Sequence, residues 1–341
     1  MREHKRIVKV GRLVAVLSAL IAIVALAGCG GSSSAESGGS TNLTLVAYST
    51  PEAAYDALIP EFQKTDAGKG VKFKTSYGSS GEQSRAVEAG LPADVVEFSL
   101  APDMDRVVEA GLVDANWSKD KYDGMVTDSV VVIAVRKGNP LGIHDWSDLT
   151  KPGVEVITPN PFTSGGARWN VMAAYGAQLE QGKSQKEAID YLDKLFHNVT
   201  VQDASARDSL QTFTGGKGDV LLAYENEAIA AQQAGEDIDY IVPDQTILIE
   251  NPIAVTSDSR SPDQAQAFVD FLHTPKAQHM WGEKGYRPVD KKEFEKFDFP
   301  IPPELFTIGK VGGWDTVMVK FFDPDKGIMA DIEREVGEPT E

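Results

Sequence analysis

The chain has 341 residues, of which 42% are hydrophobic and 25% are charged, and its formal net charge is −18. This composition is typical of a soluble globular protein, and the excess of acids makes nucleic acid and anionic membrane surfaces poor partners. The single cysteine excludes an intramolecular disulfide framework and a multi-cysteine metal site.

The first 28 residues are typical of a lipoprotein signal peptide. Five basic residues and one acid precede an apolar run at 13–27, which is shorter than the ~20 residues that a membrane-spanning helix needs. The run ends in Leu26-Ala27-Gly28-Cys29, a sequence typical of a bacterial lipobox. We therefore expect cleavage after residue 28 and lipidation of Cys29.

A linker follows the cysteine. Residues 30–40 are almost all Gly and Ser, a composition that cannot bury a core. We expect 29–41 to tether a folded body, through the lipid alone, to the outer face of the cytoplasmic membrane, on its periplasmic or extracellular side. Removal of residues 1–28 takes the net charge from −18 to −22 and leaves enough chain for one large or two ordinary domains.

The first part of the body alternates strand and helix patterns. Strands are predicted at 43–47, 71–76 and 94–98, and helices at 53–64, 81–89 and 101–110. This order predicts a parallel or mixed sheet with helices on both faces, an α/β fold.

A second series of elements begins with a long apolar strand at 128–140. Strands follow at 154–158, 219–223 and 247–255, and helices at 166–178, 186–195 and 261–272, the last with Ser261 as its cap and Pro262 in its first turn. Two long strands that bracket a middle segment predict two lobes joined by two crossings, with the ligand in the cleft between them. The expected boundaries are 42–128 together with 256–341 for the first lobe, and 129–255 for the second.

Three loops share one design, in which small residues stand directly before a helix pattern. They lie at 78–81, 163–166 and 204–206. Such a loop presents unpaired N–H groups and the positive end of a helix dipole, and glycine lets a ligand approach the backbone. Ser and Gly before a helix are also ordinary caps. Three such loops, one in the first lobe and two in the second, favour a shared anion.

Other chemistries have weaker support in the sequence. The five histidines form no i,i+4 pair and lie outside the three loops, so we expect no histidine metal site. The loops contain neither a nucleophile elbow nor a P-loop lysine, so we expect neither a serine hydrolase nor a phosphoryl-transfer enzyme. The nearest rival is ferric-ion binding, which needs clustered phenolates and carboxylates, by Tyr48, Tyr55, Tyr77 and Tyr224.

Five segments together resemble the sulfate-binding proteins of bacterial ABC importers, in their lipid-anchored form. The segments are YGSSGEQSRAV, KGNPLGIHDWSDL, KPGVEVITPNPFTSGGARWN, GDVLLAYENEA and GYRPVD. The resemblance runs from about Leu43 to Trp314. It implies a two-lobed fold of the type II periplasmic-binding-protein kind, with mixed sheets that carry helices on both faces. It also implies that the lobes close over a dehydrated sulfate or thiosulfate held mainly by backbone N–H groups, with no cofactor and no metal.

Carried onto this chain, the resemblance implies a set of ligand donors from both lobes: Ser80 from the first, and Ser164, Gly165, Gly166, Ala206 and Tyr224 from the second. Tyr224 stands where the family commonly has a tryptophan, whose indole N–H donates; a phenol donates with a different reach. The family often has an aspartate after the first strand, where this chain has Ser49, and we expect Ser49 to donate directly to the ligand.

The function implied is that of an extracytoplasmic solute-binding lipoprotein, not an enzyme, that acts as a monomer and delivers sulfate to an ABC permease in the membrane. Alternatives are a receptor for thiosulfate or molybdate, and a ligand sensor or surface lipoprotein that keeps the fold without transport. Because all the implied ligand groups donate, we expect oxyanions that carry a proton, such as phosphate near pH 7, to be refused. We also expect Arg85 and Arg168 to pair with neighbours, and Asp208 to face solvent.

Overall fold

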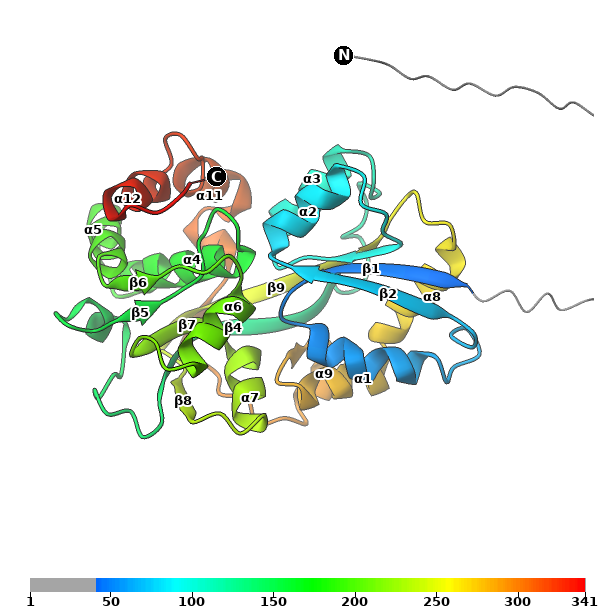
Figure 1. Ribbon diagram of the computed structural model, residues 1–341, viewed down its shortest axis with the longest axis horizontal. Helices are drawn as coiled ribbons and strands as arrows, with labels where there is room; N and C mark the ends of the chain where they lie inside the picture. Colours follow the sequence, from blue (N-terminus) through cyan, green and yellow to red (C-terminus); the bar gives the residue numbers. More distant parts are fainter. Residues whose placement is uncertain (1–40, 341) are drawn as a thin grey trace, which may run out of the picture. The chain divides into compact units, whose positions relative to one another are not determined.

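The computed structural model describes residues 41–340. The predicted signal peptide, the lipidation site Cys29 and the linker up to residue 40 lie outside the described residues. In residues 41–340, no helix combines the length and the apolar character needed to cross a membrane. One eleven-stranded sheet runs through this body, in the order β2-β1-β3-β9-β4-β7-β5-β6, with β8 and β10 attached to β4 and β11 to β9 (Figure 1).

We call the first group of elements the first lobe. It consists of β1 (Asn42–Tyr48), α1 (Glu52–Phe62), β2 (Lys72–Gly78), α2 (Ser80–Glu88), β3 (Val95–Glu97), α3 (Ala101–Glu109), α8 (Pro262–Leu272) and α9 (Pro275–Glu283). β1 pairs in parallel with β2 and β3. Because side chains alternate along a strand, Leu43 and Leu45 pack with α1, α8 and α9, whereas Val46 packs with α2 and α3. Helices therefore cover both faces, as predicted (Figure 1).

We call the second group the second lobe. It consists of β5 (Val156–Ile157), α4 (Gly165–Glu180), α5 (Gln185–Phe196), β6 (Val199–Val201), α6 (Ala206–Thr214), β7 (Val220–Tyr224), α7 (Glu225–Gln233) and β8 (Ile238–Ile241). Its central strand is the second half of β4 (Met125–Arg136). Val131 and Ile133 share a core with α4 and α5, whereas Val132 and Ala134 share one with α6 and α7. Burial on both faces explains the continuous apolar run of this strand.

Two strands connect the lobes. The first half of β4 pairs antiparallel with β9 (Gln245–Val255), from Met125 opposite Pro252 to Val130 opposite Leu248. The second half of β4 pairs with β7 and β8, and the last residues of β9 pair with β3. Each strand thus leaves one lobe and enters the other, and the chain passes between the lobes a third time between residues 283 and 304.

The end of the chain packs differently from the expected boundary. β11 (Glu304–Phe306) adds to β9 at 245–247, and Phe306, Phe321 and Met329 share the core of α4 and α5. The elements involved are η2 (Ile308–Val311), α11 (Gly313–Phe321) and α12 (Ile328–Val336). The segment from about residue 304 therefore belongs with the second lobe and not, as predicted, with the first, because its apolar side chains complete the cover of α4. The shorter elements are η1 (Trp146–Thr150), β10 (Arg287–Pro288) and α10 (Lys291–Phe294).

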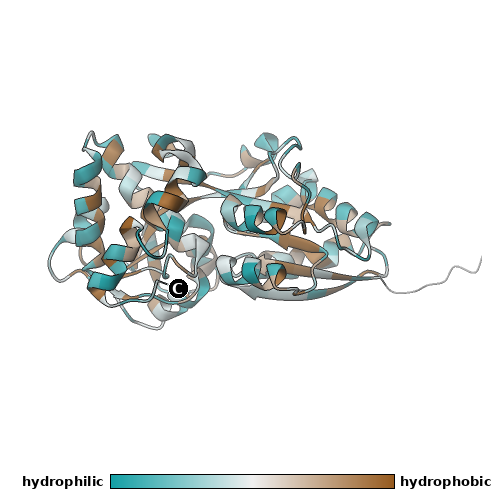
Figure 2. Cartoon of the chain, turned by 90° about the horizontal axis from the view of Figure 1, so that it is seen from above, coloured by the Kyte–Doolittle hydropathy of each residue, from teal (hydrophilic) through white to brown (hydrophobic). Residues whose placement is uncertain are grey.

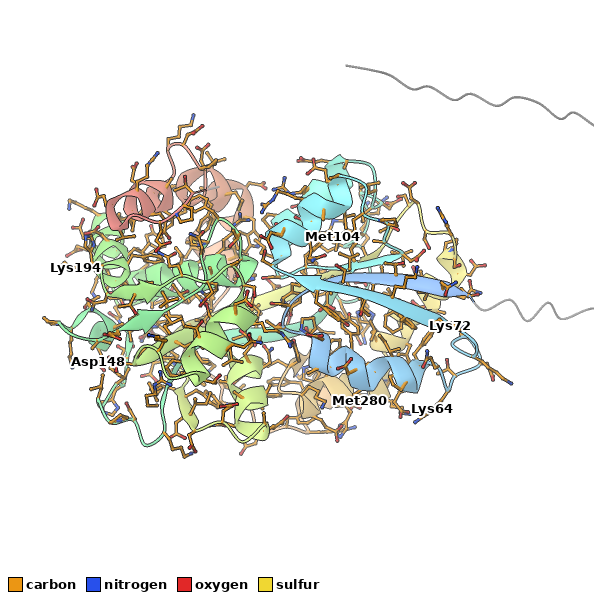
Figure 3. All side chains as sticks on the ribbon, viewed as in Figure 1. Lys64, Lys72, Met104, Asp148, Lys194 and Met280 are labelled. Atoms are coloured by element: carbon orange, nitrogen blue, oxygen red, sulfur yellow. The ribbon has the colours of Figure 1, made fainter. Side chains whose placement is uncertain are left out.

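Hydropathy follows this layering. Figure 2 shows hydrophobic strands inside and mixed helices outside, with their hydrophilic sides outward. Charged side chains such as Lys64, Lys72 and Lys194 are exposed and lie at the periphery (Figure 3). The polar groups that remain inside are therefore the ones that need an explanation.

Candidate functional site

The first of the three loops ends β2 and begins α2. Ser79 is extended, with φ −65° and ψ 141°, and α2 starts at Ser80, one residue earlier than predicted. The first N–H groups of a helix have no intrahelical acceptor, and within the described residues those of Ser80 and Gly81 have no acceptor elsewhere. The Ser79 hydroxyl is buried and likewise has no hydrogen-bond partner in this part of the chain.

The second loop begins α4. Ser164 caps this helix by accepting a hydrogen bond from the N–H of Ala167 at 3.4 Å, and its own N–H donates to the Asn160 carbonyl at 2.9 Å. No acceptor for the N–H groups of Gly165 and Gly166 is found in residues 41–340. The loop thus leaves two adjacent glycine donors free.

The third loop begins α6. Ser205 accepts from the N–H of Asp208 at 3.2 Å and donates to its carboxylate at 2.7 Å. Asp208 is exposed, which confirms that expectation. Ala206 opens the helix, so its N–H lies in the first turn, where it has no intrahelical acceptor.

The three helix starts lie together. A Cβ built on Gly81 would lie 2.9 Å from the Thr163 carbonyl oxygen, and one built on Gly166 would lie 3.4 Å from the Ala206 Cβ. A groove of 460 Å³ is lined by both Ser79 and Ser205. Residues from both lobes therefore surround one point, on which the positive ends of three helix dipoles converge.

Tyr224 closes the point from the end of β7. Its ring passes 3.6 Å from the position of a Cβ on Gly166, and its hydroxyl lies 2.7 Å from the hydroxyl of Ser99, which follows β3 in the first lobe. Both side chains are 1% exposed. The pair joins the two lobes at the convergence of the helix starts.

Ser80 lies at the same point as the other helix starts, but its hydroxyl already forms two hydrogen bonds within the protein. Its hydroxyl donates to the Asp103 carboxylate at 2.5 Å and accepts from the N–H of Ser99 at 3.0 Å. A hydroxyl has one proton, so the backbone N–H is the donor that Ser80 has left. Arg168 donates to the Pro161 carbonyl at 2.8 Å and lies 3.9 Å from Asp103, so it pairs with neighbours as expected.

Ser49 lies at the edge of the site, on the loop between β1 and α1. Its carbonyl accepts from the guanidinium of Arg207 at 3.0 Å, and Arg207 also contacts the Thr50 carbonyl at 3.4 Å and the Glu52 carboxylate at 2.9 Å. Because Arg207 follows Ala206 on α6, one side chain of the second lobe holds this loop of the first lobe next to the helix starts.

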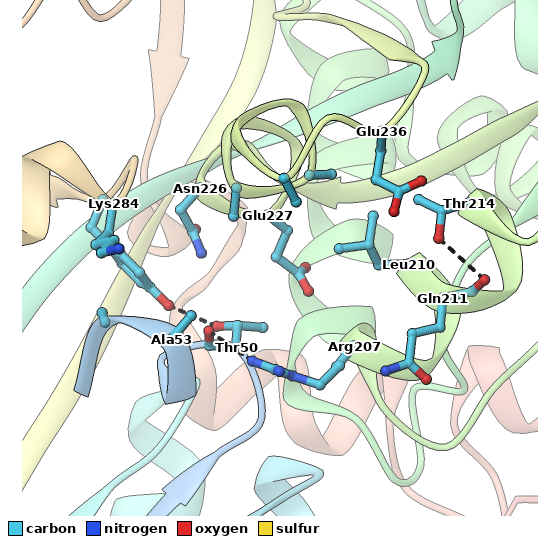
Figure 4. Close-up of a pocket in the computed structure, with 15 residues that line it drawn as sticks. Thr50, Ala53, Arg207, Leu210, Gln211, Thr214, Asn226, Glu227, Glu236 and Lys284 are labelled. Atoms are coloured by element: carbon cyan, nitrogen blue, oxygen red, sulfur yellow. Dashed lines mark hydrogen bonds between the residues drawn. The ribbon is translucent and has the colours of Figure 1, made fainter. Parts of the chain in front are cut away.

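Behind Arg207 lies a second cavity of 240 Å³, between α1, α6 and α7 (Figure 4). Glu227 faces it, and burial raises the pKa of this carboxyl to about 7. On the first-lobe side the Thr50 hydroxyl bonds to that of Tyr286 at 3.1 Å. The carboxyl group of Glu227 disfavours the binding of an anion in this cavity, so the helix starts remain the candidate site.

The tyrosines that the ferric-ion alternative would need pair with different groups. Tyr55 donates to buried Glu97, whereas Tyr224 pairs with Ser99. Burial raises the pKa of Tyr48, Tyr55 and Tyr224 well above the ordinary value, which disfavours the phenolates that iron needs. A separate group of possible metal ligands, Asp193, His197 and Glu335, has its ligand atoms within 4.8 Å of one another but contains no residue of the three loops.

Three residues that the sequence did not single out belong to the site's framework. Ser99 and Asp103 sit at the end of β3 and the start of α3, and Arg207 follows the third loop. A small polar residue directly after the buried run of β3 was the available signal for Ser99, since strand ends in one sheet meet at one edge. Nothing in the sequence indicated the partners of Asp103 and Arg207.

Comparisons with known proteins all find bacterial solute-binding proteins similar to this chain. The model of a family described as bacterial extracellular solute-binding protein matches residues 43–287. A sulfate-binding protein of Synechococcus elongatus is 41% identical over 88% of this chain and 90% of its own length. A thiosulfate-binding protein of Pseudomonas aeruginosa is 33% identical over 84% of this chain and 90% of its own. The solved structure of the sulfate-binding protein SubI from Mycobacterium tuberculosis H37Rv superposes with a TM-score of 0.81 at 45% identity and covers 83% of this chain and 100% of that one.

Proposed function

The chain belongs to the bacterial extracellular solute-binding proteins, in the family of the sulfate-binding proteins, and we propose that it captures sulfate in its cleft for delivery to an ABC permease. Its fold is the two-lobed α/β fold of type II periplasmic binding proteins. The protein acts by binding and closing around its ligand, without catalysis, and as a monomer.

One observation carries this proposal: first-turn N–H groups of three helices, which have no acceptor among residues 41–340, lie together with Tyr224 at one point between the lobes. Near neutral pH sulfate carries no proton, so all its oxygens accept hydrogen bonds. Amides and helix dipoles act at short range in a low-dielectric cleft, whereas the net charge of −18 is screened by salt within ~8 to 10 Å. An acidic protein can therefore bind a dianion without a lysine or arginine on it.

Thiosulfate is the second candidate ligand. The groove of 460 Å³ beside Ser79 and Ser205 gives room for an anion longer than sulfate. The buried Ser79 hydroxyl has no partner among residues 41–340. It is therefore a hydrogen-bond donor that an anion in this groove could use. A relative in the same family is named for this anion.

The experiment that tests the proposal is a calorimetric titration of the purified body with sulfate, thiosulfate, phosphate and molybdate. Ser164→Ala and Ser184→Ala form a matched pair, because each removes the N-cap of a second-lobe helix and costs about 1 kcal/mol of helix stability. Ser164→Ala should weaken sulfate binding, whereas Ser184→Ala, at the exposed start of α5 and outside the three loops, should not. Equal affinity in both variants, or no sulfate binding by the wild type, would contradict the proposed site.

The anchor has its own test. We propose that Cys29 is acylated and holds the protein at the outer face of the membrane. Cys29→Ala should abolish labelling with a radioactive fatty acid and release the protein from the membrane fraction. Acyl label that persists in this variant would rule out the anchor.

A further inference from the structure

The cavity of 240 Å³ behind Arg207 lies apart from the point where the helix starts meet (Figure 4). Residues of α6 and α7 in the second lobe form its walls, and residues of α1 in the first lobe close it together with Tyr286. We propose that this cavity is a second binding site, which takes a small organic cation with an apolar body, such as a substituted ammonium ion. The inference is independent of the proposed function, because it uses no N–H group of the helix starts.

Two helices turn matching stripes of side chains toward this cavity. On α6 the lining residues are 207, 210, 211 and 214, and on α7 with its C-cap they are 227, 230, 231 and 234. Each set has the i, i+3, i+4, i+7 spacing of one helix face. Residues 230, 231 and 234 are alanines, whose short side chains leave space between the helices. A volume of 240 Å³ is roughly that of eight water molecules at ~30 Å³ each, so a ligand of about eight heavy atoms fits.

Glu227 is the buried charged group of the cavity. This residue is 5% exposed, and its carboxyl points from α7 into the space (Figure 4). As the third residue of α7 it accepts a hydrogen bond from the backbone of Tyr224 at the start of the helix. A carboxylate has about four acceptor positions, and no side chain among residues 41–340 donates to this one. Glu227 thus keeps acceptor positions that a ligand in the cavity can fill.

Arg207 forms the wall between this cavity and the groove at the helix starts, since it lines both. Its guanidinium is already held by the Ser49 and Thr50 carbonyls and by the Glu52 carboxylate at 2.9 Å. It therefore acts on Glu227 through its charge alone and donates no hydrogen bond to it. The carboxyl of Glu227 has no ion-pair partner in the described part of the chain.

Three other titratable residues face the cavity. Glu236 is exposed and Lys284 is half-buried, and neither forms an ion pair with Glu227 within residues 41–340. The phenol of Tyr286 is neutral, because burial raises its pKa well above the ordinary value. The buried charge is therefore acidic, and alanine methyl groups and Leu210 supply apolar walls. A ligand that matches this arrangement has a positively charged N–H donor at one end and an apolar group at the other.

The experiment is a calorimetric titration of the purified protein with benzylammonium, benzyl alcohol and benzoate, which share one shape but differ in charge. Each titration is run with and without saturating sulfate, so that both arrangements of the lobes are sampled. We expect benzylammonium to bind with a Kd on the order of 1 mM, as is usual for a ligand of this size. Benzyl alcohol and benzoate should bind at least about tenfold more weakly, because the ammonium alone can pair with the carboxylate.

Three variants locate the binding. Glu227→Gln keeps the shape of the side chain and an oxygen for the Tyr224 backbone, and it should weaken benzylammonium at least about tenfold. Glu236→Gln removes the exposed acid of the same cavity and should weaken it less than about threefold, because exposed charges contribute little. Ala230→Leu should abolish binding by filling the space, although every charge is kept. Cooperative thermal unfolding reports that each variant is folded.

The pH dependence adds a readout that a purely apolar site would not give. Burial raises the pKa of Glu227 to about 7, so the carboxyl is mostly ionised at pH 8 and mostly neutral at pH 6. Benzylammonium should therefore bind several-fold more tightly at pH 8 than at pH 6, whereas benzyl alcohol should bind equally at both.

Three results would overturn the inference: benzylammonium that binds wild type no better than benzyl alcohol, an equal loss in Glu227→Gln and Glu236→Gln, or wild-type affinity in Ala230→Leu. Sulfate titrations of the same samples separate this inference from the proposed function. A wild type that binds benzylammonium but not sulfate refutes the proposed function alone, and one that binds sulfate but not benzylammonium refutes this inference alone.

Discussion

The two faces of the cleft are built from different chemistry. On the first-lobe face, the hydroxyls of Ser80 and Ser99 are already engaged in hydrogen bonds, with Asp103 and with Tyr224. On the second-lobe face, Gly165 and Gly166 offer backbone N–H groups that have no acceptor in residues 41–340. In the proposed site, the second lobe thus offers bare glycine donors, whereas the first lobe combines backbone donors with hydroxyls that already have protein partners. An added side chain on a glycine should therefore damage the second-lobe face, whereas removal of a hydroxyl should damage the first-lobe face.

The largest effect should come from adding a side chain to the glycine face. A Cβ on Gly165 would lie 2.0 Å from Leu100 and 2.7 Å from the Ser99 hydroxyl oxygen, so Gly165→Val should keep the lobes from closing. With two charge-assisted hydrogen bonds lost, we expect sulfate affinity to fall roughly a hundredfold or more. Calorimetry measures this, and wild-type affinity in a folded Gly165→Val protein would refute the two-face description.

Gly166→Ala is the comparison for that variant. The three atoms nearest to its Cβ would belong to Ala206, Ser164 and Tyr224, at 3.4 to 3.6 Å, all on the second lobe. It should therefore permit closure and weaken sulfate binding less than Gly165→Val does. Small-angle scattering with and without sulfate would show closure in Gly166→Ala and none in Gly165→Val.

An intermediate effect should come from Arg207, whose hydrogen bonds join the second lobe to the first beside the helix starts. Arg207→Met removes hydrogen bonds to the Ser49 and Thr50 carbonyls but leaves the backbone donors of the three helix starts unchanged. We expect sulfate to dissociate about tenfold faster, which is the effect of losing one or two kcal/mol of lobe contact. Stopped-flow tryptophan fluorescence measures that rate.

Glu52→Gln is the control for Arg207→Met. It removes only the charged partner of Arg207, and both side chains of that pair are at least one-third exposed. Exposed pairs contribute about 1 kcal/mol or less. A dissociation rate that rises as much in Glu52→Gln as in Arg207→Met would mean that the backbone contacts of Arg207 carry little.

The smallest effect on sulfate affinity should come from a substitution of Glu97, which is buried at the end of β3. The free energy of unfolding, in contrast, should change. Burial raises the pKa of Glu97 to about 8, from an ordinary value of 4.5. Between these values the folded protein holds a proton that the unfolded chain has lost, so this carboxyl makes the protein less stable as pH rises. The slope is about 1.4 kcal/mol per pH unit, and it ends near pH 8.

Glu97→Gln keeps the shape of the side chain without the charge. We expect it to raise the melting temperature relative to wild type, by more at pH 8 than at pH 5, and to leave sulfate affinity at pH 6 nearly unchanged. Thermal unfolding at several pH values tests this. The same difference in melting temperature at both pH values would show that Glu97 is already ionised in the folded protein.

Local pattern was enough for much of this fold. The starts of α2, α4 and α6 follow from small residues ahead of helix formers, and β4 and β9 follow from long apolar runs. Ser261, in contrast, stands before α8 but does not cap it with its side chain, because its backbone (φ −141°, ψ 58°) departs from the usual cap conformation.

Contacts between distant parts of the chain were beyond local pattern. Ser99 meets Tyr224 across 125 residues, and Arg207 meets Ser49 across 158. These pairings depend on how two lobes face each other, which no periodicity encodes. The packing of α11 and α12 on the second lobe was missed for the same reason: amphipathic helices show that they need a partner, but not which one.

The paired crossing strands also limit how the molecule can move. A single connecting segment would let one lobe swivel about its own backbone bonds. Here β4 and β9 are joined by ladder hydrogen bonds from Met125 opposite Pro252 to Val130 opposite Leu248. β10 pairs with β4 at Thr127 and Asp128, inside this stretch, and the chain crosses again between residues 283 and 304. Twisting or sliding such a junction would break ladder hydrogen bonds, whereas bending it would not. We therefore expect the lobes to open by bending at this junction, a motion that would bring Gly165 back to the same contact with Ser99 on closing.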